Sequence, residues 1–314
     1  MNETSSARVA VVTTSYPSHA RDWAGHFVRQ EALELARSGC AVTVLTTRDA
    51  VSDDGVRAIG LAEGLFSAFG APGAVPRIAA FPPRVLSVAL WAARVRGALR
   101  RERFDRVVAH WAVPSAWPAL PALGGAELEV VSHGGDVRAL VALPAAARRA
   151  IVARVASRAS SWRFVSAELE EALLASLDDE LASRVRAIAF VRAPSLDVPD
   201  VSRRARDLRA ALGAFDVSLG RLVASKRVER AIDRAAARGE LLVVVGDGPE
   251  RSALERRASR ASAPVRFVGD LPRDEALAYL AAARALVFAS EAEGCSTVVR
   301  EARELRTRVD HLER

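Results

Sequence analysis

The sequence predicts an α/β protein made of two Rossmann-like domains. Short apolar runs of strand length alternate with amphipathic helical segments, which is the pattern of a parallel sheet wrapped by helices. The 314 residues, 50% of them hydrophobic, are enough for two medium domains that each have a core. A Pro-bearing stretch at 187–201 is the best candidate boundary. We therefore expect an N-terminal domain over residues 1–193 and a C-terminal domain over residues 194–314.

The net charge of +7 comes from arginine, because Lys226 is the only lysine in the chain. This charge is compatible with anionic substrates or an anionic membrane surface, and we expect no nucleic-acid partner. The longest apolar runs fall short of the ~18 residues that a membrane span needs, and the N-terminus lacks a signal-peptide pattern. Cys40 and Cys295 have no metal-type spacing. The expected localisation is therefore cytoplasmic, with peripheral contact to the inner membrane face as an option.

The first elements are those of a βαβ unit. A strand and its loop are expected from Arg8 to Ser18, an amphipathic helix from His26 to Gly39 and a second strand from Cys40 to Thr47. The loops of such a unit open at the carboxyl edge of the sheet, where these folds bind ligands. The segment Asp22–Gly25 lies there, either as a ligand-binding loop or as an ordinary turn.

The next two segments are ambiguous. Residues 51–83 scatter Gly and Pro among short apolar pieces and indicate no clear element. Residues 84–104 are expected to form a basic amphipathic helix. Such a helix either lies on a membrane surface or packs on its own sheet with solvated arginines, and the second reading is favoured.

Two later strands end in histidine. The strand from Asp105 ends in His110 and Trp111, and the strand from Leu128 runs into His133, a glycine pair and Asp136. His110 is as readily a hydrogen-bonded strand-end residue as a ligand-binding one. The glycines beside His133 allow close backbone approach, which favours a functional role for this residue.

The C-terminal half carries cations and a carboxylate in places that suit a nucleotide. Arg221 and Lys226 stand in a strand-to-helix connection, where a guanidinium and an ammonium can meet phosphate oxygens. Glu301 lies in the second turn of a helix expected to start at Thr297, where a carboxylate can accept hydrogen bonds from ribose. An NAD site is not expected, because Arg251 stands where a dinucleotide fingerprint has its third glycine.

Four segments of this half, in this order, resemble the donor half of family 4 glycosyltransferases. They are GRLVASKR (220–227), VVGDGPER (244–251), VRFVGDL (265–271) and SEAEGCSTVVREA (290–302). The HW strand end and the HG-x-D element of the N-terminal half also resemble family positions. The resemblance implies the GT-B fold, in which two Rossmann-like domains face each other across a cleft.

The resemblance also implies an activity and a set of residues. The activity is transfer of a hexose, with retention, from a nucleotide-diphosphate sugar to a lipid-linked, polysaccharide or other glycan acceptor. The implied catalytic residues are His133 and Glu293, and the acceptor-side residues are His110 and Asp136. The implied donor contacts are Gly25, Arg221, Lys226, Gly294 and Glu301. No cofactor and no metal are expected, since the nucleotide-sugar is a substrate and the chain has no aliphatic-flanked Asp-x-Asp.

The sequence departs from the family pattern near its end. The final helix is expected to continue almost to the last residue, because apolar residues recur at helical spacing at Val298, Ala302, Leu305, Val309 and Leu312. Arg306 and Arg308 stand where the family has a Gly-x-Pro turn into another strand. The second domain is therefore expected to be incomplete. Two alternatives to an active glycosyltransferase stay open: a truncated, catalytically inactive relative that binds a nucleotide or a partner, and, with less support, a nucleotide-sugar epimerase.

Overall fold

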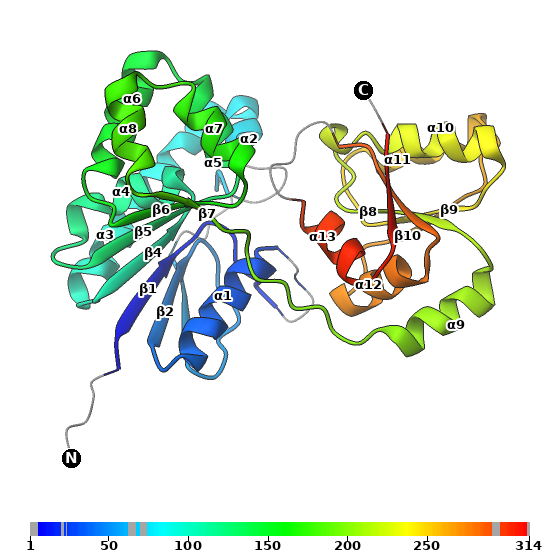
Figure 1. The fold of residues 1–314 in the computed structure, drawn as a ribbon, viewed down its shortest axis with the longest axis horizontal. Coiled ribbons are helices and arrows are strands. Elements are labelled where there is room, and N and C mark those ends of the chain that lie inside the picture. The colour runs from blue at the N-terminus through cyan, green and yellow to red at the C-terminus, as the bar shows by residue number, and fades with distance from the viewer. Residues whose placement is uncertain are drawn as a thin grey trace. The chain divides into compact units, whose positions relative to one another are not determined.

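The computed structural model describes residues 6–19, 22, 24–61, 67–69, 74–290 and 296–312. The chain divides into two compact units, Met1–Ser195 and Leu196–Arg314, each built around its own parallel sheet (Figure 1). The division falls two residues after the boundary that the sequence suggested. It lies in the segment that follows the last strand of the first unit.

The first unit contains a seven-stranded sheet with the order β3-β2-β1-β4-β5-β6-β7, in which every pair is parallel. Its strands are β1 (Arg8–Val12), β2 (Ala41–Thr46), β3 (Val56–Gly60), β4 (Arg106–His110), β5 (Glu127–Ser132), β6 (Ser161–Phe164) and β7 (Ala189–Val191). Its α-helices are α1 (His26–Arg37), α2 (Ala74–Ala80), α3 (Val85–Arg101), α4 (Trp117–Ala119), α5 (Gly135–Ala142), α6 (Ala145–Ala156), α7 (Ala167–Leu174) and α8 (Asp179–Arg186). Short helices of other types are η1 (Pro82–Arg84), η2 (Ala112–Ala116) and η3 (Leu120–Ala122).

Helices cover both faces of this sheet, which explains why its strands read as continuous apolar runs. In Figure 1, α1 lies below the strands and α6, α7 and α8 lie above them. The strand β1 buries four of its five residues, and the largest fully buried side chains of the unit include Trp91, Trp162 and Phe164. The expected βαβ start is present as β1, α1 and β2.

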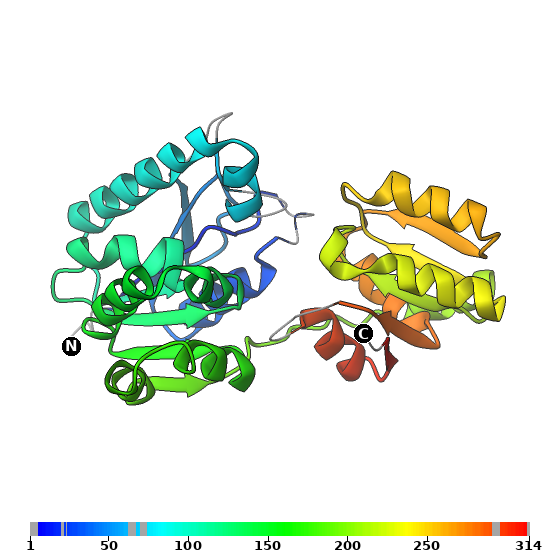
Figure 2. The same cartoon turned by 90° about the horizontal axis from the view of Figure 1, so that it is seen from above.

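The second unit contains a five-stranded parallel sheet with the order β10-β9-β8-β11-β12. Its strands are β8 (Asp216–Leu219), β9 (Leu242–Val245), β10 (Val265–Gly269), β11 (Ala285–Phe288) and β12 (Arg308–His311). Its helices are α9 (Ser202–Leu212), α10 (Val228–Arg238), α11 (Arg251–Arg260), α12 (Arg273–Ala282), α13 (Thr297–Glu304) and the short η4 (Ala224–Lys226). One apolar cluster joins α9, α12 and α13 to the sheet, and a second joins α10 and α11 to its other face. Figure 2 shows these layers from above.

The expected continuous C-terminal helix is wrong. Helix α13 ends at Glu304, and β12 then pairs in parallel with β11. Arg306 adopts a left-handed φ of 58°, its N–H donates to Arg303 O, and Thr307 N–H donates to Ala302 O at 2.7 Å. These two bonds form a Schellman C-cap without the usual glycine. Val309 packs on the core from β12, so an apolar residue at this position fits a strand as well as a helix.

The ambiguous segments also resolve. Residues 51–83 contain β3 and α2, which the sequence did not indicate. Helix α3 packs on its own unit by burying Trp91, Ala92, Val95 and Leu99. This packing is the interpretation that the sequence favoured for the basic helix. Within the described ranges, no helix is both long and apolar enough to cross a membrane.

Candidate functional site

Each sheet has one point where the strand order reverses, and doubly wound folds bind ligands beside the carboxyl ends of the strands at that point. In the first unit β1 lies between β2 and β4, and in the second unit β8 lies between β9 and β11. His110 is the last residue of β4, His133 follows β5, and Arg221 and Lys226 follow β8. The topology thus brings predicted site residues to one edge of each sheet.

His110 and His133 are in direct contact. Nδ1 of His110 lies 2.9 Å from Nε2 of His133, and the two rings stack with an interplanar angle of 16°. His110 is fully buried and His133 is partly exposed. Burial, and to a smaller extent the charge of Arg163, lowers the pKa of His110 to about 3. Burial, His110 and Arg163 hold the pKa of His133 well below its ordinary value, so both rings are neutral at pH 7.

Aromatic rings fix the orientation of His133. The ring of Phe27 lies 4.8 Å from it between centroids, and the ring of Trp111 lies 5.1 Å away. Trp111 has a φ of 71°, an uncommon value for a non-glycine residue, and its N–H donates to Val131 O at 2.7 Å. Strained backbone of this kind is typical of functional sites.

Asp136 holds two loops together. It is 2% exposed and accepts four hydrogen bonds, from Ser132 Oγ at 2.7 Å and from the N–H groups of Ala112, His133 and Gly134 at 2.8, 3.2 and 3.2 Å. The acceptor-side role of Asp136 stays a prediction, and the contacts of the buried carboxylate in this structure are to its own loops. It thereby fixes the backbone that carries His133. His110 is also buried and is hydrogen-bonded to His133 at the end of β4, and its acceptor-side role stays a prediction.

A chain of buried ion pairs lies beside the histidines. Arg163 of β6, only 3% exposed, pairs with Glu31 of α1 and lies 3.1 Å through Nε from Oε1 of Glu129 on β5. Glu129 also pairs with Arg106 of β4. Oε2 of Glu31 lies 3.9 Å from Nε2 of His110. Sequence reasoning missed this network, although a charged residue inside an apolar strand, as in SWRF and ELEVVS, was the available signal.

Gly25 sits at a close backbone approach. It precedes α1 with a φ of 74°, and a Cβ at this position would lie 2.2 Å from Ser15 O. Asp22 ties the same loop together by accepting hydrogen bonds from Ser18 N–H and Oγ and from Ala24 N–H. The loop Asp22–Gly25 is therefore built, within its described residues, around a position that only glycine fills.

In the second unit, Arg221 and Lys226 line a small pocket. Its wall comes from the ends of β8 and β11 and the loops that follow them, Ser218–Arg221 and Leu286–Ser290, together with Lys226 and Val228. Lys226 is partly buried and Arg221 is exposed. Burial, and then repulsion by Arg221, lowers the pKa of Lys226 to about 8. An anion placed here would relieve that repulsion.

The Gly246-Asp247-Gly248 loop supports this pocket. Gly246 has a φ of 129°, and a Cβ there would lie 2.0 Å from Gly220 O. Gly220 N–H donates to Val245 O at 3.0 Å, and Leu222 N–H donates to Asp247 O at 2.9 Å. The glycines that look like a dinucleotide fingerprint thus allow this loop to pack closely against the loop that carries Arg221.

Glu301 has a partner that the sequence did not indicate. It is 5% exposed, and its Oε1 accepts a hydrogen bond from Arg273 at 2.8 Å. Ser296 precedes α13, but its hydroxyl makes no capping bond. Glu293 and Gly294, for which the family resemblance implied catalytic and donor roles, lie outside the described residues.

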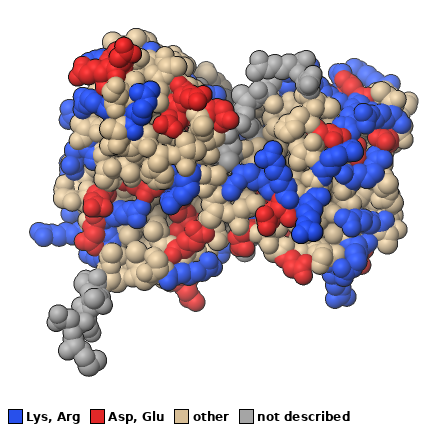
Figure 3. Space-filling view, in the orientation of Figure 1, with Lys and Arg blue, Asp and Glu red and all other residues tan. Residues whose placement is uncertain are grey.

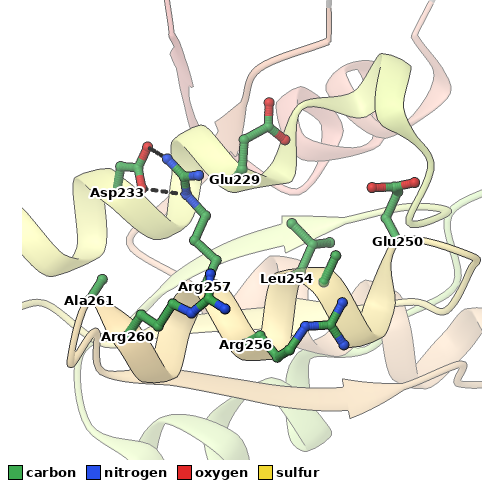
Figure 4. Close-up of a pocket in the computed structure, with 9 residues that line it drawn as sticks. Glu229, Asp233, Glu250, Leu254, Arg256, Arg257, Arg260 and Ala261 are labelled. Carbon is green, nitrogen blue, oxygen red and sulfur yellow. Dashed lines mark hydrogen bonds and ion pairs between the residues drawn. The ribbon is translucent and has the colours of Figure 1, made fainter.

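A wider groove lies elsewhere on the second unit. Figure 4 shows it between α10 and α11, with Glu229, Glu250, Arg256 and Arg260 around a bidentate pair of Asp233 and Arg257 at 2.7 Å. This groove lies on the helical layer rather than at the strand ends, and its charges are mixed. Figure 3 shows the same mixing, with basic and acidic side chains interspersed on the face drawn. Among the described residues, no group of three or more His, Cys, Asp or Glu could hold a metal ion.

Comparison with solved structures shows a common fold. Sucrose-phosphate synthase from Thermosynechococcus elongatus is 18% identical, with a TM-score of 0.70 over 97% of this chain and 81% of that one. WaaG, a glycosyltransferase involved in lipopolysaccharide biosynthesis, is 17% identical, with a TM-score of 0.65 over 96% and 80%. Anabaena Alr3699/HepE, solved in complex with UDP, is 16% identical, with a TM-score of 0.65 over 96% and 79%. No curated protein sequence matches the chain.

Family models match both units. The model described as "Glycosyl transferases group 1" matches residues 217–309. The model described as "Glycosyltransferase Family 4" matches residues 24–189, which is more than half of the chain. Together with the two-domain Rossmann-like fold shared with GT-B glycosyltransferases, these matches show that the chain belongs to glycosyltransferase family 4.

Proposed function

We propose that this glycosyltransferase moves a hexose from a nucleotide-diphosphate sugar to a glycan acceptor with retention of anomeric configuration. The observation that carries the proposal is the pocket at the ends of β8 and β11, where Lys226 is held next to Arg221. A leaving diphosphate gains negative charge in the transition state, and preorganised cations stabilise that charge. The HepE structures, which contain UDP, glucose or UDP-glucose, make UDP-glucose the first donor to test.

The predicted catalytic and donor-site residues then have the following roles. Arg221 and Lys226 bind the diphosphate, and Glu301 accepts a hydrogen bond from the ribose through the oxygen that Arg273 leaves unused. His133 contacts the sugar, and Gly25 allows the loop before α1 to approach it. Glu293 and Gly294 keep the sugar-contacting roles that the family resemblance implies. No metal or cofactor takes part in this proposal, because the two cations supply the charge that the leaving group needs.

Donor hydrolysis in the absence of an acceptor tests the reaction and its stereochemistry together. The protein is incubated with UDP-α-glucose, and proton NMR records which anomer of glucose appears before mutarotation. Early α-glucose supports a retaining enzyme, and early β-glucose contradicts retention. Nucleotide binding with no hydrolysis and no transfer to any lipid-linked or polysaccharide acceptor would favour a binding protein without turnover.

We further propose that the start of α3 touches an anionic membrane that carries a lipid-linked acceptor. Phe81, Val85, Leu86 and Leu90 expose 41–71% of their surface there, next to Arg84. An apolar edge beside arginine, in a protein with a net charge of +7, suits an anionic interface. Co-sedimentation with phosphatidylglycerol vesicles should fall in Leu86→Ser/Leu90→Ser and persist in Val141→Ser, a control at another exposed apolar residue. Equal sedimentation of all three proteins would contradict the assignment.

A further inference from the structure

We propose that Glu31 is a positioning residue that acts through His110 to fix the tautomer of His133. In this arrangement Nε2 of His133 carries the proton, and Nδ1 accepts a hydrogen bond from a hydroxyl of the sugar substrate. The contact with a sugar rests on the proposed function, whereas the tautomer is a property of the ligand-free protein.

One proton lies between the two rings, and the question is which nitrogen carries it. Nδ1 of His110 and Nε2 of His133 are 2.9 Å apart, so one nitrogen donates and the other accepts. Both rings are neutral because burial lowers the pKa of each. Only two arrangements fit these conditions. In the first, Nδ1 of His110 carries a proton and donates it to His133, and Nε2 of His110 is unprotonated. In the second, Nε2 of His133 carries a proton and donates it to Nδ1 of His110, and the proton of His110 lies on its Nε2.

Glu31 selects between these arrangements. Its Oε2 lies 3.9 Å from Nε2 of His110, a buried nitrogen with no hydrogen-bond partner. A bare lone pair facing a carboxylate is repelled, whereas an N–H facing it is attracted, and both effects are strong in a buried site. Arg163 lowers the pKa of His110 and so acts in the opposite direction, but its charge is paired with both Glu31 and Glu129. The favoured state therefore puts a proton on Nε2 of His110, and His133 must then donate through its own Nε2.

Arg163 holds the Glu31 carboxylate in place. This arginine pairs with Glu31 and Glu129, and Arg106 pairs with Glu129, so two carboxylates balance two guanidinium groups. The mutual attraction of these opposite charges offsets the cost of burying them. Glu129 has the same charge and the same arginine partner, but within the described ranges no ion pair connects it to a histidine.

The consequence for recognition concerns Nδ1 of His133. This nitrogen has no hydrogen-bond partner in the described part of the chain, and Phe27 and Trp111 restrict the rotation of the ring. A neutral ring with a bare Nδ1 accepts a hydrogen bond, so it suits a hydroxyl group and not a phosphate oxygen. Glu31 would in this way set the kind of group that His133 recognises.

NMR of the ligand-free protein with ¹⁵N-labelled histidine tests the tautomer. The chain has five histidines, so long-range ¹H–¹⁵N spectra can be assigned with His110→Gln and His133→Gln. We expect both His110 and His133 to be protonated on Nε2 in the wild type. A proton on Nδ1 of either ring in the wild type would overturn the proposal.

Variants test the role of Glu31. Glu31→Gln should shift Nδ1 of His133 toward the protonated position, and Glu129→Gln, the matched control, should leave it unchanged. Glu31→Asp keeps a carboxylate that can pair with Arg163, but its shorter side chain moves the charge away from His110. This variant should therefore also shift the tautomer of His133, and it replaces Glu31→Gln in the test if Glu31→Gln fails to fold. An unchanged tautomer in a folded Glu31 variant, or an equal shift in Glu129→Gln, would overturn the role of Glu31.

Binding separates this inference from the proposed function. Glu31→Gln should weaken UDP-glucose binding by about tenfold, the loss of one hydrogen bond, and leave UDP binding unchanged. If neither ligand binds the wild type, the proposed function fails while the tautomer result stands by itself. If the tautomer shifts and UDP-glucose affinity does not change, His133 does not accept a hydrogen bond from the sugar.

Discussion

Arg273 donates one hydrogen bond to Oε1 of Glu301 at 2.8 Å and a second, through the same nitrogen, to the backbone oxygen of Asp197 at 2.5 Å. The pair joins the start of α12 to the middle of α13 and to the segment before α9. Arg273 thus supplies a counter-charge to the buried side chain of Glu301. The second oxygen of Glu301 has no partner among the described residues and remains available to a ribose hydroxyl.

Arg273→Ala should lower the free energy of unfolding by about 2 kcal/mol, because it leaves the Glu301 carboxylate buried without a counter-charge. Urea unfolding measures this change. In a double-mutant cycle, Arg273→Ala/Glu301→Ala should lose less than the sum of the single losses. Additive losses would show that the two side chains do not interact.

Lys226 should make nucleotide binding depend on pH. The ammonium form binds phosphate, and burial lowers the pKa of Lys226 to about 8 in the ligand-free protein. UDP affinity should therefore fall as pH rises from 7 to 9, and binding at pH 8 should take up a proton, since a diphosphate raises this pKa. Calorimetry in two buffers of different ionisation enthalpy measures the uptake. Lys226→Arg, which stays charged over this pH range, should bind UDP without proton uptake. A UDP affinity of the wild type that does not change with pH would contradict the role of Lys226 in binding phosphate.

The same residue should cost the ligand-free protein stability. Because the pKa of Lys226 is lowered in the folded state, the charged form is disfavoured there, and this cost is fully present below pH 8 and disappears as pH rises toward 10.5. The free energy of unfolding of the wild type, taken relative to that of Lys226→Met, should therefore rise by about 1–2 kcal/mol between pH 8 and pH 10.5, after allowance for partial exposure. A difference between the two proteins that does not change with pH would contradict the lowered pKa of Lys226.

Arg306→Gly should stabilise the second unit by about 0.5–1 kcal/mol. The residue holds a left-handed φ of 58° in the Schellman cap after α13, and glycine adopts that conformation without the Cβ penalty. Arg303→Gly, three residues earlier inside the helix, should destabilise by a similar amount. Thermal unfolding should show a midpoint temperature above that of the wild type for Arg306→Gly and below it for Arg303→Gly. A lowered midpoint in Arg306→Gly would contradict the prediction.

Gly246→Ala should disrupt the pocket. The added Cβ would lie 2.0 Å from Gly220 O, so the Arg221 loop has to move. We expect loss of UDP affinity of at least tenfold together with lower stability. Gly125→Ala is the matched control, because its Cβ would enter open space. UDP binding of Gly246→Ala at wild-type affinity would show that this loop does not set the pocket.

The sequence predicted the larger part of the fold because the relevant signals are local. Alternating apolar runs and amphipathic helices indicate a doubly wound sheet, whichever elements they pack against. The strand that ends at His110 and the strand that precedes His133 follow from the same pattern. The C-terminal strand β12 was missed because apolar spacing around Val309 fits two periods and Arg306 replaces the glycine that marks a helix end.

The side-chain pairings could not be predicted in the same way. Glu31 meets Arg163 across 132 residues, and Arg273 meets Glu301 across 28, so both depend on how the elements pack rather than on any local motif. The role of Asp136 likewise appears only when the loops after β4 and β5 are brought together by the sheet. The predicted donor contacts of Gly25, Arg221, Lys226 and Glu301 stay predictions until ligands are measured.

The most direct test of a nucleotide-sugar site is calorimetric titration of the wild type, Lys226→Ala and Arg256→Ala with UDP, GDP and their glucose and mannose conjugates. Arg256 is an exposed arginine on α11, in the groove between α10 and α11, so its variant controls for loss of one positive charge. We predict saturable binding of one nucleotide and its sugar conjugate to the wild type and to Arg256→Ala, and loss of at least tenfold in affinity in Lys226→Ala. No binding of any of these ligands to the folded wild type, or equal binding to all three proteins, would contradict the proposed site.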